Sequence, residues 1–387
     1  MELLTSQQLK ELLALRKWLH QNPELSGNEQ QTSRKLEDFI QQTQPHKVIT
    51  GLGGHGVAAV YVYDEQGPTI LVRADMDALP IEEVNTFAHK SENDGVSHKC
   101  GHDGHSAILA GLALALKNKP LSAGRVVLLF QPEEETGQGA AKVIADEAFK
   151  MIQPDKAIAL HNLPGFSKAA IVLKEGPFAA ASTGMIVEIK GASSHAANPE
   201  QGNSPYKMLA EAMLQLTELP EKKKDIFKDF CLVTIIHAKL GEVAFGTNPG
   251  KAILMATLRT FLNEDMDKLK KKAEILVKTL AEENKLKIDI SWTEEFPATI
   301  NDKEITEVIR NVSEDLGEEI IEIEEPFRWS EDFGHFTSRF PAVLFGIGSG
   351  KDSPGLHNHD YDFPDEILPH AVQVFYHTLK KLTTNKK

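Results

Sequence analysis

The sequence lacks the features of a secreted or membrane-embedded protein. It has 387 residues but only two cysteines, Cys100 and Cys231, and a secreted protein of this length seldom relies on so few. The longest apolar stretch, 107–116, is about half the length that a membrane-spanning helix needs. The charged, amphipathic N-terminal segment lacks the apolar centre of a signal peptide. We therefore expect a cytoplasmic protein with no membrane partner.

Basic residues are also in short supply. The chain has 56 acidic against 42 basic side chains, which gives a formal net charge of −14. Nucleic acids and anionic membranes bind concentrated positive surfaces, so we expect neither as a partner. A small anionic substrate needs only one or two local cations and stays compatible with this charge. Apolar residues make up 41% of the chain, enough for a sizeable core.

Strand and helix patterns alternate along most of the chain, which predicts an α/β fold. The run RVVLLFQP (125–132) is apolar almost throughout, as in strands that are buried on both faces of a parallel sheet. We therefore expect a mainly parallel sheet. The predicted strands are 56–63, 69–76, 125–132, 157–162 and 342–348, and the predicted helices are 6–20, 28–43, 105–117, 138–150, 302–316 and 364–382.

The middle of the chain has a different pattern. Its strands and helices follow the order β-α-β-β-α-β, which is typical of a ferredoxin-like α+β unit. The predicted elements are strands 184–191, 231–241, 251–261 and 286–292, and helices 204–219 and 263–285. Because the α/β pattern resumes afterwards, we predict a discontinuous domain, 1–180 and 296–387, interrupted by a second domain, 181–295.

The stretch HKCGHDGHSA (98–107) carries the most unusual chemistry. A lone histidine is more often a packing residue than a ligand, and on its own this stretch is compatible with a helix start or with half of a metal site. Further polar side chains follow predicted strands: Glu134 and Glu135 in QPEEETGQG, His161 in ALHN, and His357 in PGLHNHDYDF. Since parallel strands end at one edge of a sheet, we expect these groups to meet there.

Thiolate, imidazole and carboxylate together suit zinc, manganese or cobalt. Five candidate ligands exceed what one catalytic ion uses, and they fit two ions about 3.5–4 Å apart. The adjacent pair Glu134 and Glu135 can then divide two tasks. One carboxylate binds metal, and the other takes a proton from a water molecule. This is hydrolytic chemistry.

Six motifs in order identify a family. They are RADMDALP (73–80), CGHDGHSA (100–107), FQPEEETGQGA (130–140), HNLPG (161–165), GASSHAANP (191–199) and SEDFGHF (330–336). The chain resembles the M20 metallopeptidase family from about residue 10 to 375. It is most similar to the amidohydrolase branch, subfamily D, which includes hippurate hydrolases, N-acyl-amino-acid deacylases and auxin-conjugate hydrolases. The resemblance implies a zinc-exopeptidase-like catalytic domain with a ferredoxin-like satellite domain.

Carried over by position, the resemblance also implies roles for single residues. It assigns Glu134 as the general base and makes Asp75 the acid that supports the metal centre, with Asp77 as the second choice. The implied metal ligands are Cys100, His102, Glu135, His161 and His357, with Cys100 bridging two divalent ions of the manganese, zinc or cobalt class. In the satellite domain, His195 would stabilise the oxyanion in the partner protomer, and Asn248 and Arg259 would bind the substrate carboxylate.

The resulting hypothesis is metal-dependent hydrolysis of N-acyl amino acids to a carboxylic acid and a free amino acid. His195 acting across protomers predicts a homodimer formed through the satellite domain. The alternatives are a dipeptidase or metallocarboxypeptidase of the same family, and an inactive relative that binds a ligand or a metal. The chain departs from the family at Thr136, Gln138 and the loop before Asn248, which leaves the acyl group and the amino acid open.

Overall fold

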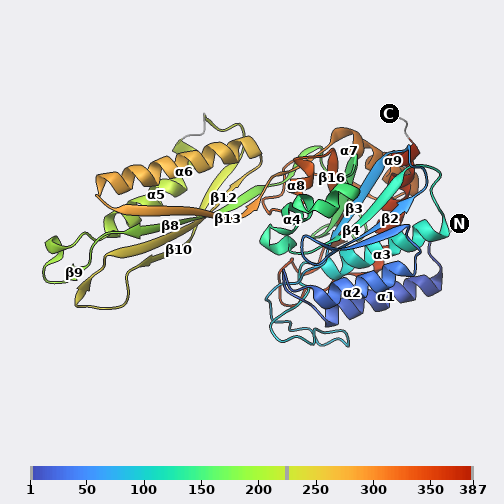
Figure 1. Ribbon diagram of the computed structural model, residues 1–387, viewed down its shortest axis with the longest axis horizontal. Helices are drawn as coiled ribbons and strands as arrows, with labels where there is room; N and C mark the ends of the chain where they lie inside the picture. The colour runs from blue at the N-terminus through green and yellow to red at the C-terminus, as the bar shows by residue number, and fades with distance from the viewer. Residues whose placement is uncertain (1–2, 223–225, 385–387) are drawn as a thin grey trace. The chain divides into compact units, whose positions relative to one another are not determined.

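The computed structural model of the protein describes residues 3–222 and 226–384. The chain forms two compact units, each with its own sheet (Figure 1). The first unit comprises the residues up to Phe178, Thr299–Glu325 and the residues from Asp332 on, and the second comprises Ala179–Ala298 and Pro326–Glu331. The chain thus crosses between units two and three residues away from the boundaries predicted at 180/181 and 295/296.

One segment belongs to a different unit from the one predicted. Residues 326–331 were expected in the first domain but pack with the second unit. The backbone N–H of Ala180 donates to the carbonyl oxygens of Phe327 and Trp329, both at 3.0 Å. Arg259 Nη1 donates to the carbonyl oxygen of Arg328 at 2.8 Å. These contacts join segments that are far apart in the sequence, so no local pattern reveals them.

The first unit is built on an eight-stranded sheet of the order β1-β2-β4-β3-β5-β16-β6-β15. The central strands β4, β3, β5 and β16 are parallel, whereas β1 and β2 are antiparallel additions at one edge and β6 is antiparallel to β16. This is the mainly parallel α/β sheet that the sequence predicts. The strands are β1 Lys47–Leu52, β2 Gly56–Val62, β3 Thr69–Asp75, β4 Arg125–Gln131, β5 Lys156–Pro164, β6 Ile171–Leu173, β15 Ile320–Glu322 and β16 Ala342–Gly350.

Helix α3, His102–Asn118, lies at the centre of the helical layer and is buried from His102 to Leu116. It packs against α1 and α9. Two glycines allow this close approach, since a Cβ on Gly104 would lie 2.2 Å from the ring of Phe363 and one on Gly111 would lie 2.8 Å from Val372. The other helices of this unit are α1 Ser6–Gln21, α2 Gln30–Gln41, α4 Gly139–Ala145, α7 Lys303–Leu316, α8 Gly334–Thr337 and α9 Leu368–Thr384.

Some element boundaries differ from the predictions. Helix α3 begins at His102 rather than 105, because Gly101 adopts a left-handed φ of 97° and turns the chain directly into the helix. The predicted helix 138–150 ends as α4 at Ala145. Asp146 is extended there, and its side chain accepts from the N–H of Ala148 to start a separate 3-10 turn. The short strands β1, β6 and β15 were not predicted, because three to six residues carry little periodicity.

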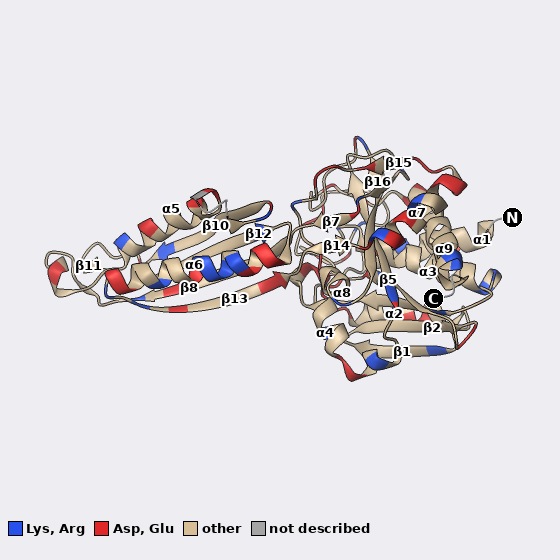
Figure 2. Cartoon of the chain, turned by 90° about the horizontal axis from the view of Figure 1, so that it is seen from above, with Lys and Arg blue, Asp and Glu red and all other residues tan. Residues whose placement is uncertain are grey.

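The second unit has an antiparallel sheet of the order β10-β12-β8-β13, with two helices in the predicted β-α-β-β-α-β sequence. Its main elements are β8 Ala181–Lys190, α5 Tyr206–Lys222, β10 Cys231–Leu240, β12 Lys251–Thr260, α6 Asn263–Glu283 and β13 Lys287–Phe296. A two-stranded ladder of β9, Ser194–His195, and β11, Thr247–Asn248, completes it. Lysines and acidic residues are interspersed along α6, as Figure 2 shows.

Within the described residues, no helix combines the length and the apolar character that a membrane span requires.

Candidate metal centre

The ends of three neighbouring parallel strands bring the predicted site residues together. Strand β3 ends at Asp75, and β4 ends at Gln131, just before Glu134 and Glu135. Strand β5 contains His161. Both β4 and β5 pair with β3 in parallel. Cys100 and His102 approach from the start of α3. The carboxyl edge of a parallel sheet is where ligands usually bind.

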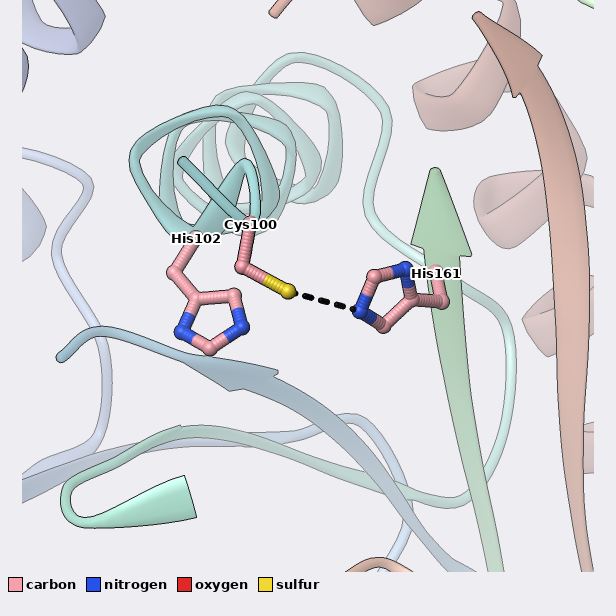
Figure 3. A group of neighbouring side chains, drawn as sticks. All are labelled: Cys100, His102 and His161. Carbon is pink, nitrogen blue, oxygen red and sulfur yellow. Dashed lines mark hydrogen bonds between the residues drawn. The ribbon is translucent and has the colours of Figure 1, made fainter. Parts of the chain in front are cut away.

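Cys100, His102 and His161 face one another at this edge (Figure 3). All three side chains are buried. Cys100 Sγ lies 3.5 Å from His161 Nε2. His161 Nδ1 lies 2.9 Å from the carbonyl oxygen of Asn162, to which it can only donate, so the lone pair of Nε2 points toward the thiol. A thiol and an imidazole lone pair directed at one point are typical metal ligands.

His102 offers a second imidazole lone pair. Its Nδ1 donates to the carbonyl oxygen of Asp77 at 2.9 Å. Its Nε2 has no hydrogen-bond partner among the described residues, and neither has the buried Oε1 of Glu135. These two atoms are 3.8 Å apart, and Glu134 Oε2 lies 3.9 Å from the same Nε2. An ion about 2 Å from each atom would fit between them. Leaving such atoms unpaired costs free energy that a cation would recover.

His357 comes to the site from a loop without regular structure. Its backbone is left-handed, with φ at 64°, and its N–H donates to the carbonyl oxygen of Lys99 at 2.8 Å. Its Nε2 lies 3.8 Å from Glu135 Oε1. Cys100, Glu135 and His357 thus form a second group of converging ligand atoms beside Cys100, His102 and His161. Cys100 belongs to both groups, so the two groups share one candidate ligand atom.

The two aspartates of RADMDALP make different contacts. Asp75 accepts from His105 Nδ1 at 2.6 Å and from Arg73 Nη1 at 2.6 Å. Asp77 accepts from the N–H of Glu135 at 3.0 Å, and its other oxygen lies 3.4 Å from Nδ1 of His102. Metal-binding histidines are commonly oriented by such a partner on their second ring nitrogen. Asp75 Oδ2 also lies 3.8 Å from Nε2 of His102, so both aspartates lie beside this histidine, Asp75 on its Nε2 side and Asp77 on its Nδ1 side.

The other histidines near the site have different surroundings. His105 uses Nδ1 for Asp75 and accepts from the N–H of Asn162 with Nε2, so both of its ring nitrogens are engaged. His359 is exposed and donates to the carbonyl oxygen of Glu82 at 2.7 Å. His98 is buried, and burial lowers its pKa to about 4. None of the three is needed to complete the ligand groups around Cys100.

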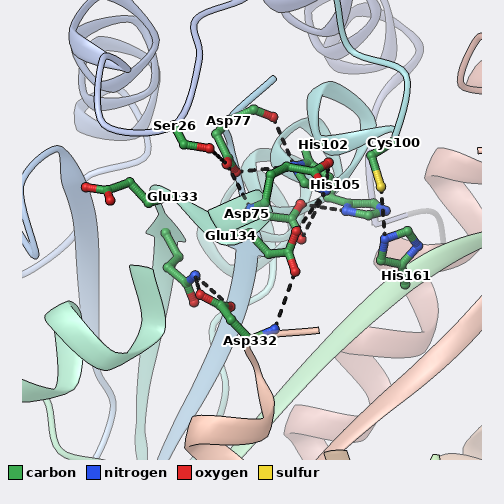
Figure 4. Close-up of polar contacts among 12 residues, drawn as sticks. Ser26, Asp75, Asp77, Cys100, His102, His105, Glu133, Glu134, His161 and Asp332 are labelled. Carbon is green, nitrogen blue, oxygen red and sulfur yellow. Dashed lines mark hydrogen bonds and ion pairs between the residues drawn. The ribbon is translucent and has the colours of Figure 1, made fainter. Parts of the chain in front are cut away.

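Asp332 is a site residue to which the sequence analysis gave no role. Its N–H donates to Glu134 Oε1 at 3.4 Å (Figure 4). Its carboxylate accepts from Arg73 and Gln131. All of these groups are buried. Asp332 lies within the motif SEDFGHF, between Glu331 and Phe333. In the sequence, the acidic side chain of Asp332 beside Phe333 in this motif is the only feature that could have pointed to a site role.

Two candidate ligands, Glu135 and Cys100, have raised pKa values, because burial and neighbouring negative charges disfavour their ionised forms. Burial, together with Asp77 and Asp75, raises the pKa of Glu135 to about 7. Burial and the neighbouring Glu135 raise the pKa of Cys100 well above its usual value. The pKa of Asp75 lies well below its usual range, because His102, His105 and Arg73 outweigh its burial. A divalent cation is the group that would allow Glu135 and Cys100 to ionise together.

The three predicted residues of the second unit are not all neighbours. His195 and Asn248 lie in the β9–β11 ladder, where the amide nitrogen of Asn248 donates to Ser194 Oγ at 3.1 Å and to Pro199 O at 3.3 Å. Arg259 lies near the other end of β12, about 26 Å from Lys251, where the strand begins next to the ladder, at the usual rise per residue. Within one copy of the unit, Arg259 and the ladder are too far apart to bind one small carboxylate.

Comparison with known proteins places the chain in a family. The model of peptidase family M20/M25/M40 matches residues 71–381. An N-acetyl-L-cysteine deacetylase of Bacillus subtilis is 31% identical over 378 residues, which cover 96% of this chain and 88% of the relative. A hippurate hydrolase of Campylobacter jejuni is 30% identical, with 93% and 94% covered. An IAA-amino acid hydrolase of Arabidopsis thaliana is 31% identical, with 94% and 83% covered.

Solved structures agree with this placement. A protein of Bacillus subtilis, described as a dinuclear metal binding peptidase from the M20 family, has a TM-score of 0.84 and 25% identity. The alignment covers 99% of this chain and all of that one. The sequence match, the fold and the converging ligands give one conclusion: the chain belongs to peptidase family M20/M25/M40, in its amidohydrolase branch, and is a metal-dependent amidohydrolase.

Proposed function

We propose that the protein hydrolyses the amide bond of N-acyl amino acids and releases a carboxylic acid and a free amino acid. The observation that carries the proposal is the pair of unpartnered ligand atoms, His102 Nε2 and Glu135 Oε1, beside a glutamate that another segment orients. Relatives named for deacetylation and for hydrolysis of hippurate and of auxin conjugates support the substrate class.

Each ligand residue has a task in this proposal. Cys100, His102, Glu135, His161 and His357 would hold two divalent ions, of the manganese, zinc or cobalt class. When bound, such ions lower the pKa of a water molecule and polarise the carbonyl group of the substrate. Asp77 keeps His102 in the tautomer that presents Nε2, since the carbonyl oxygen of Asp77 takes the Nδ1 hydrogen.

Glu134 moves the proton. Its carboxylate accepts a proton from the attacking water and then delivers it to the departing amine nitrogen. The N–H of Asp332 holds Oε1 of Glu134, and that leaves Oε2 on the side of His102. Because Asp332 is itself fixed by Arg73 and Gln131, the base is held in one orientation before substrate binds.

His195 would donate a hydrogen bond to the developing oxyanion of a partner protomer. Its Nδ1 accepts from the N–H of Ala197 at 3.0 Å, so a neutral His195 carries its hydrogen on Nε2, where it is exposed. The chain enters the second unit near Ala181, which pairs with Thr260 at one end of β8 and β12. The ladder that carries His195 follows the other end of these strands, where Lys190 pairs with Lys251. We propose that Asn248 and Arg259 bind the substrate carboxylate, with Asn248 reaching it from the same ladder as His195 and Arg259 coming from the other protomer.

A homodimer through the second unit follows from the role of His195. Strand β10 lies at the edge of its sheet, with Ile236 61% exposed, and Leu214 on the adjacent α5 is 65% exposed. An apolar edge strand of this kind favours pairing with another strand. We expect sedimentation to show a dimer at micromolar concentration, and Ile236→Lys to weaken it together with activity. A fully active monomer would refute this part of the proposal.

The reaction itself is tested with chelator-stripped protein to which manganese, zinc or cobalt is returned. The substrates are N-acetyl, N-benzoyl and indole-3-acetyl amino acids together with a few dipeptides, and the readout is free amino acid. We expect turnover of acyl amino acids that depends on metal. Turnover of dipeptides alone would favour a peptidase, and metal binding without turnover of any substrate would favour a binding protein.

A further inference from the structure

A buried ion network lies behind the metal centre and contains none of its ligands. Its six members are Arg16, His20, Glu83, Lys99, Asp103 and Asp362 (the buried ion network below). The side chains of Arg16, His20, Lys99 and Asp103 are fully buried, Glu83 is nearly so, and Asp362 is 29% exposed at the rim. Charged side chains are rarely buried in such numbers unless they are paired.

Lys99 is the first junction of the network. Its Nζ donates to Glu83 Oε1 at 2.5 Å, to Asn85 Oδ1 at 2.9 Å and to the carbonyl oxygen of Tyr361 at 2.8 Å. All three hydrogens of the ammonium group are therefore used. Its own carbonyl oxygen accepts the N–H of His357, and the next residue is Cys100. One buried lysine thus contacts both segments that carry these two ligands.

Arg16 is the second junction. Its Nε lies 3.1 Å from Asp103 Oδ2, and its Nη2 donates to Asp362 and to the carbonyl oxygen of Phe363. Asp103 directly follows the ligand His102, and Asp362 lies five residues after the ligand His357. Arg16 therefore joins α1 to the same two ligand-bearing segments that Lys99 joins.

His20 closes the network between the two junctions. Its Nδ1 is 2.8 Å from Asp103 Oδ2, and its Nε2 is 3.0 Å from Glu83 Oε1. Ionised carboxylates only accept hydrogen bonds, so both ring nitrogens donate and His20 is an imidazolium. Three cations then face three carboxylates. Two further groups adjoin the rim, since Asp365 lies 3.6 Å from Arg16 Nε and His89 Nε2 lies 3.1 Å from Asp362 Oδ2.

Such a network is weak evidence for stability, because the desolvation of buried charges commonly offsets their attraction. Its placement suggests another role. The loop that carries His357 has no helix or strand from residue 351 to 364. It is held instead by isolated backbone hydrogen bonds, such as that from His357 N–H to Lys99 O, and by the side-chain contacts of Lys99 and Arg16. We propose that Lys99 and Arg16 are positioning residues that hold Cys100, His102 and His357 in the arrangement that binds metal. The proposal rests on the metal centre of the proposed function but not on its substrate.

The test is metal titration of chelator-stripped Lys99→Met, in which an apolar chain of similar length replaces the ammonium group. The matched control is Lys150→Met, which removes an exposed ion pair with Glu147. We expect the affinity for zinc or manganese to fall about 10–100-fold in Lys99→Met, as for other residues that orient metal ligands. The control should bind like the wild type. Cobalt gives a second readout, since thiolate-to-cobalt absorption reports the bond to Cys100 and should weaken only in Lys99→Met.

A purely structural role predicts a different result. Lys99→Met would then unfold at a lower temperature while its folded fraction bound metal with wild-type affinity, and that outcome overturns the proposal. If Lys99→Met does not fold, Asp362→Asn at the rim tests the Arg16 junction. A smaller loss of metal affinity is expected there, and unchanged affinity again overturns the proposal. Since no substrate is involved, a wild type that binds metal without turnover would refute the proposed function and leave this proposal standing.

Discussion

The three consecutive glutamates of the sequence PEEET are expected to give three different results when each is changed to glutamine. Glu133 Oε2 pairs with Lys142 Nζ at 2.5 Å and points away from the ligands. Glu134 is held by the N–H of Asp332, and Glu135 Oε1 lies 3.8 Å from both His102 and His357. Glutamine keeps the size of the side chain in each case, removes its charge and its basicity, and replaces one acceptor oxygen with an NH2 donor.

The magnitudes follow from these contacts. Losing a general base costs about 10²–10⁴-fold in kcat, or about 2.7–5.5 kcal/mol, so Glu134→Gln should lose that turnover and keep its metal. Glu135→Gln removes a ligand and should weaken metal binding by more than the roughly 10–100-fold that is typical of residues behind the ligands. Glu133→Gln breaks only a partly exposed ion pair, worth about 0–1 kcal/mol, and should resemble the wild type.

The assay measures kcat on the best acyl amino acid and, separately, metal stoichiometry and affinity by titration. Glu133→Gln is the internal control, since it lies one residue away in the same turn. The reasoning is refuted if Glu134→Gln retains turnover, or if it loses metal as severely as Glu135→Gln. Equal effects of all three changes would show that the turn responds as a unit and that the division of tasks is wrong.

Three further predictions concern residues around the site. Asp77→Asn should lower metal affinity about 10–100-fold in a titration, because it removes the negative charge that lies 3.4 Å from Nδ1 of His102. Burial raises the pKa of Glu29 from 4.5 to about 7. Between pH 4.5 and pH 7 the folded protein therefore binds more protons than the unfolded chain, and it loses stability as the pH rises through this range. Glu29→Gln should therefore gain up to about 3 kcal/mol over the wild type at pH 8 and nothing at pH 4 in urea unfolding. Gly104→Ala places a Cβ 2.2 Å from the ring of Phe363 and should cost about 1–3 kcal/mol in the same assay; an unchanged midpoint would show that the ring can move.

The sequence determined the kind of chemistry, because that depends on residue types and on strand order. Glu134, Glu135 and His161 follow apolar runs, and parallel strands bring such ends to one edge. The inserted unit was also readable, since its β-α-β-β-α-β order is a local pattern along the chain. The start of α3 at His102 was not predicted from the sequence, because it depends on the left-handed φ of Gly101, and a single backbone angle does not change the pattern of apolar residues.

Contacts between distant segments were decided by the tertiary structure alone. Asp75 and Asp77 are two residues apart in one motif, and only the structure shows that the first accepts from Arg73 and His105, that the second accepts from the N–H of Glu135, and that they approach His102 from opposite ring nitrogens. The same holds for Asp332 beside Glu134 and for residues 326–331 in the second unit. Residue order reports which groups are present and along which element they lie. Hydrogen-bond partners hundreds of residues away depend on packing, and packing is a property of the folded chain as a whole.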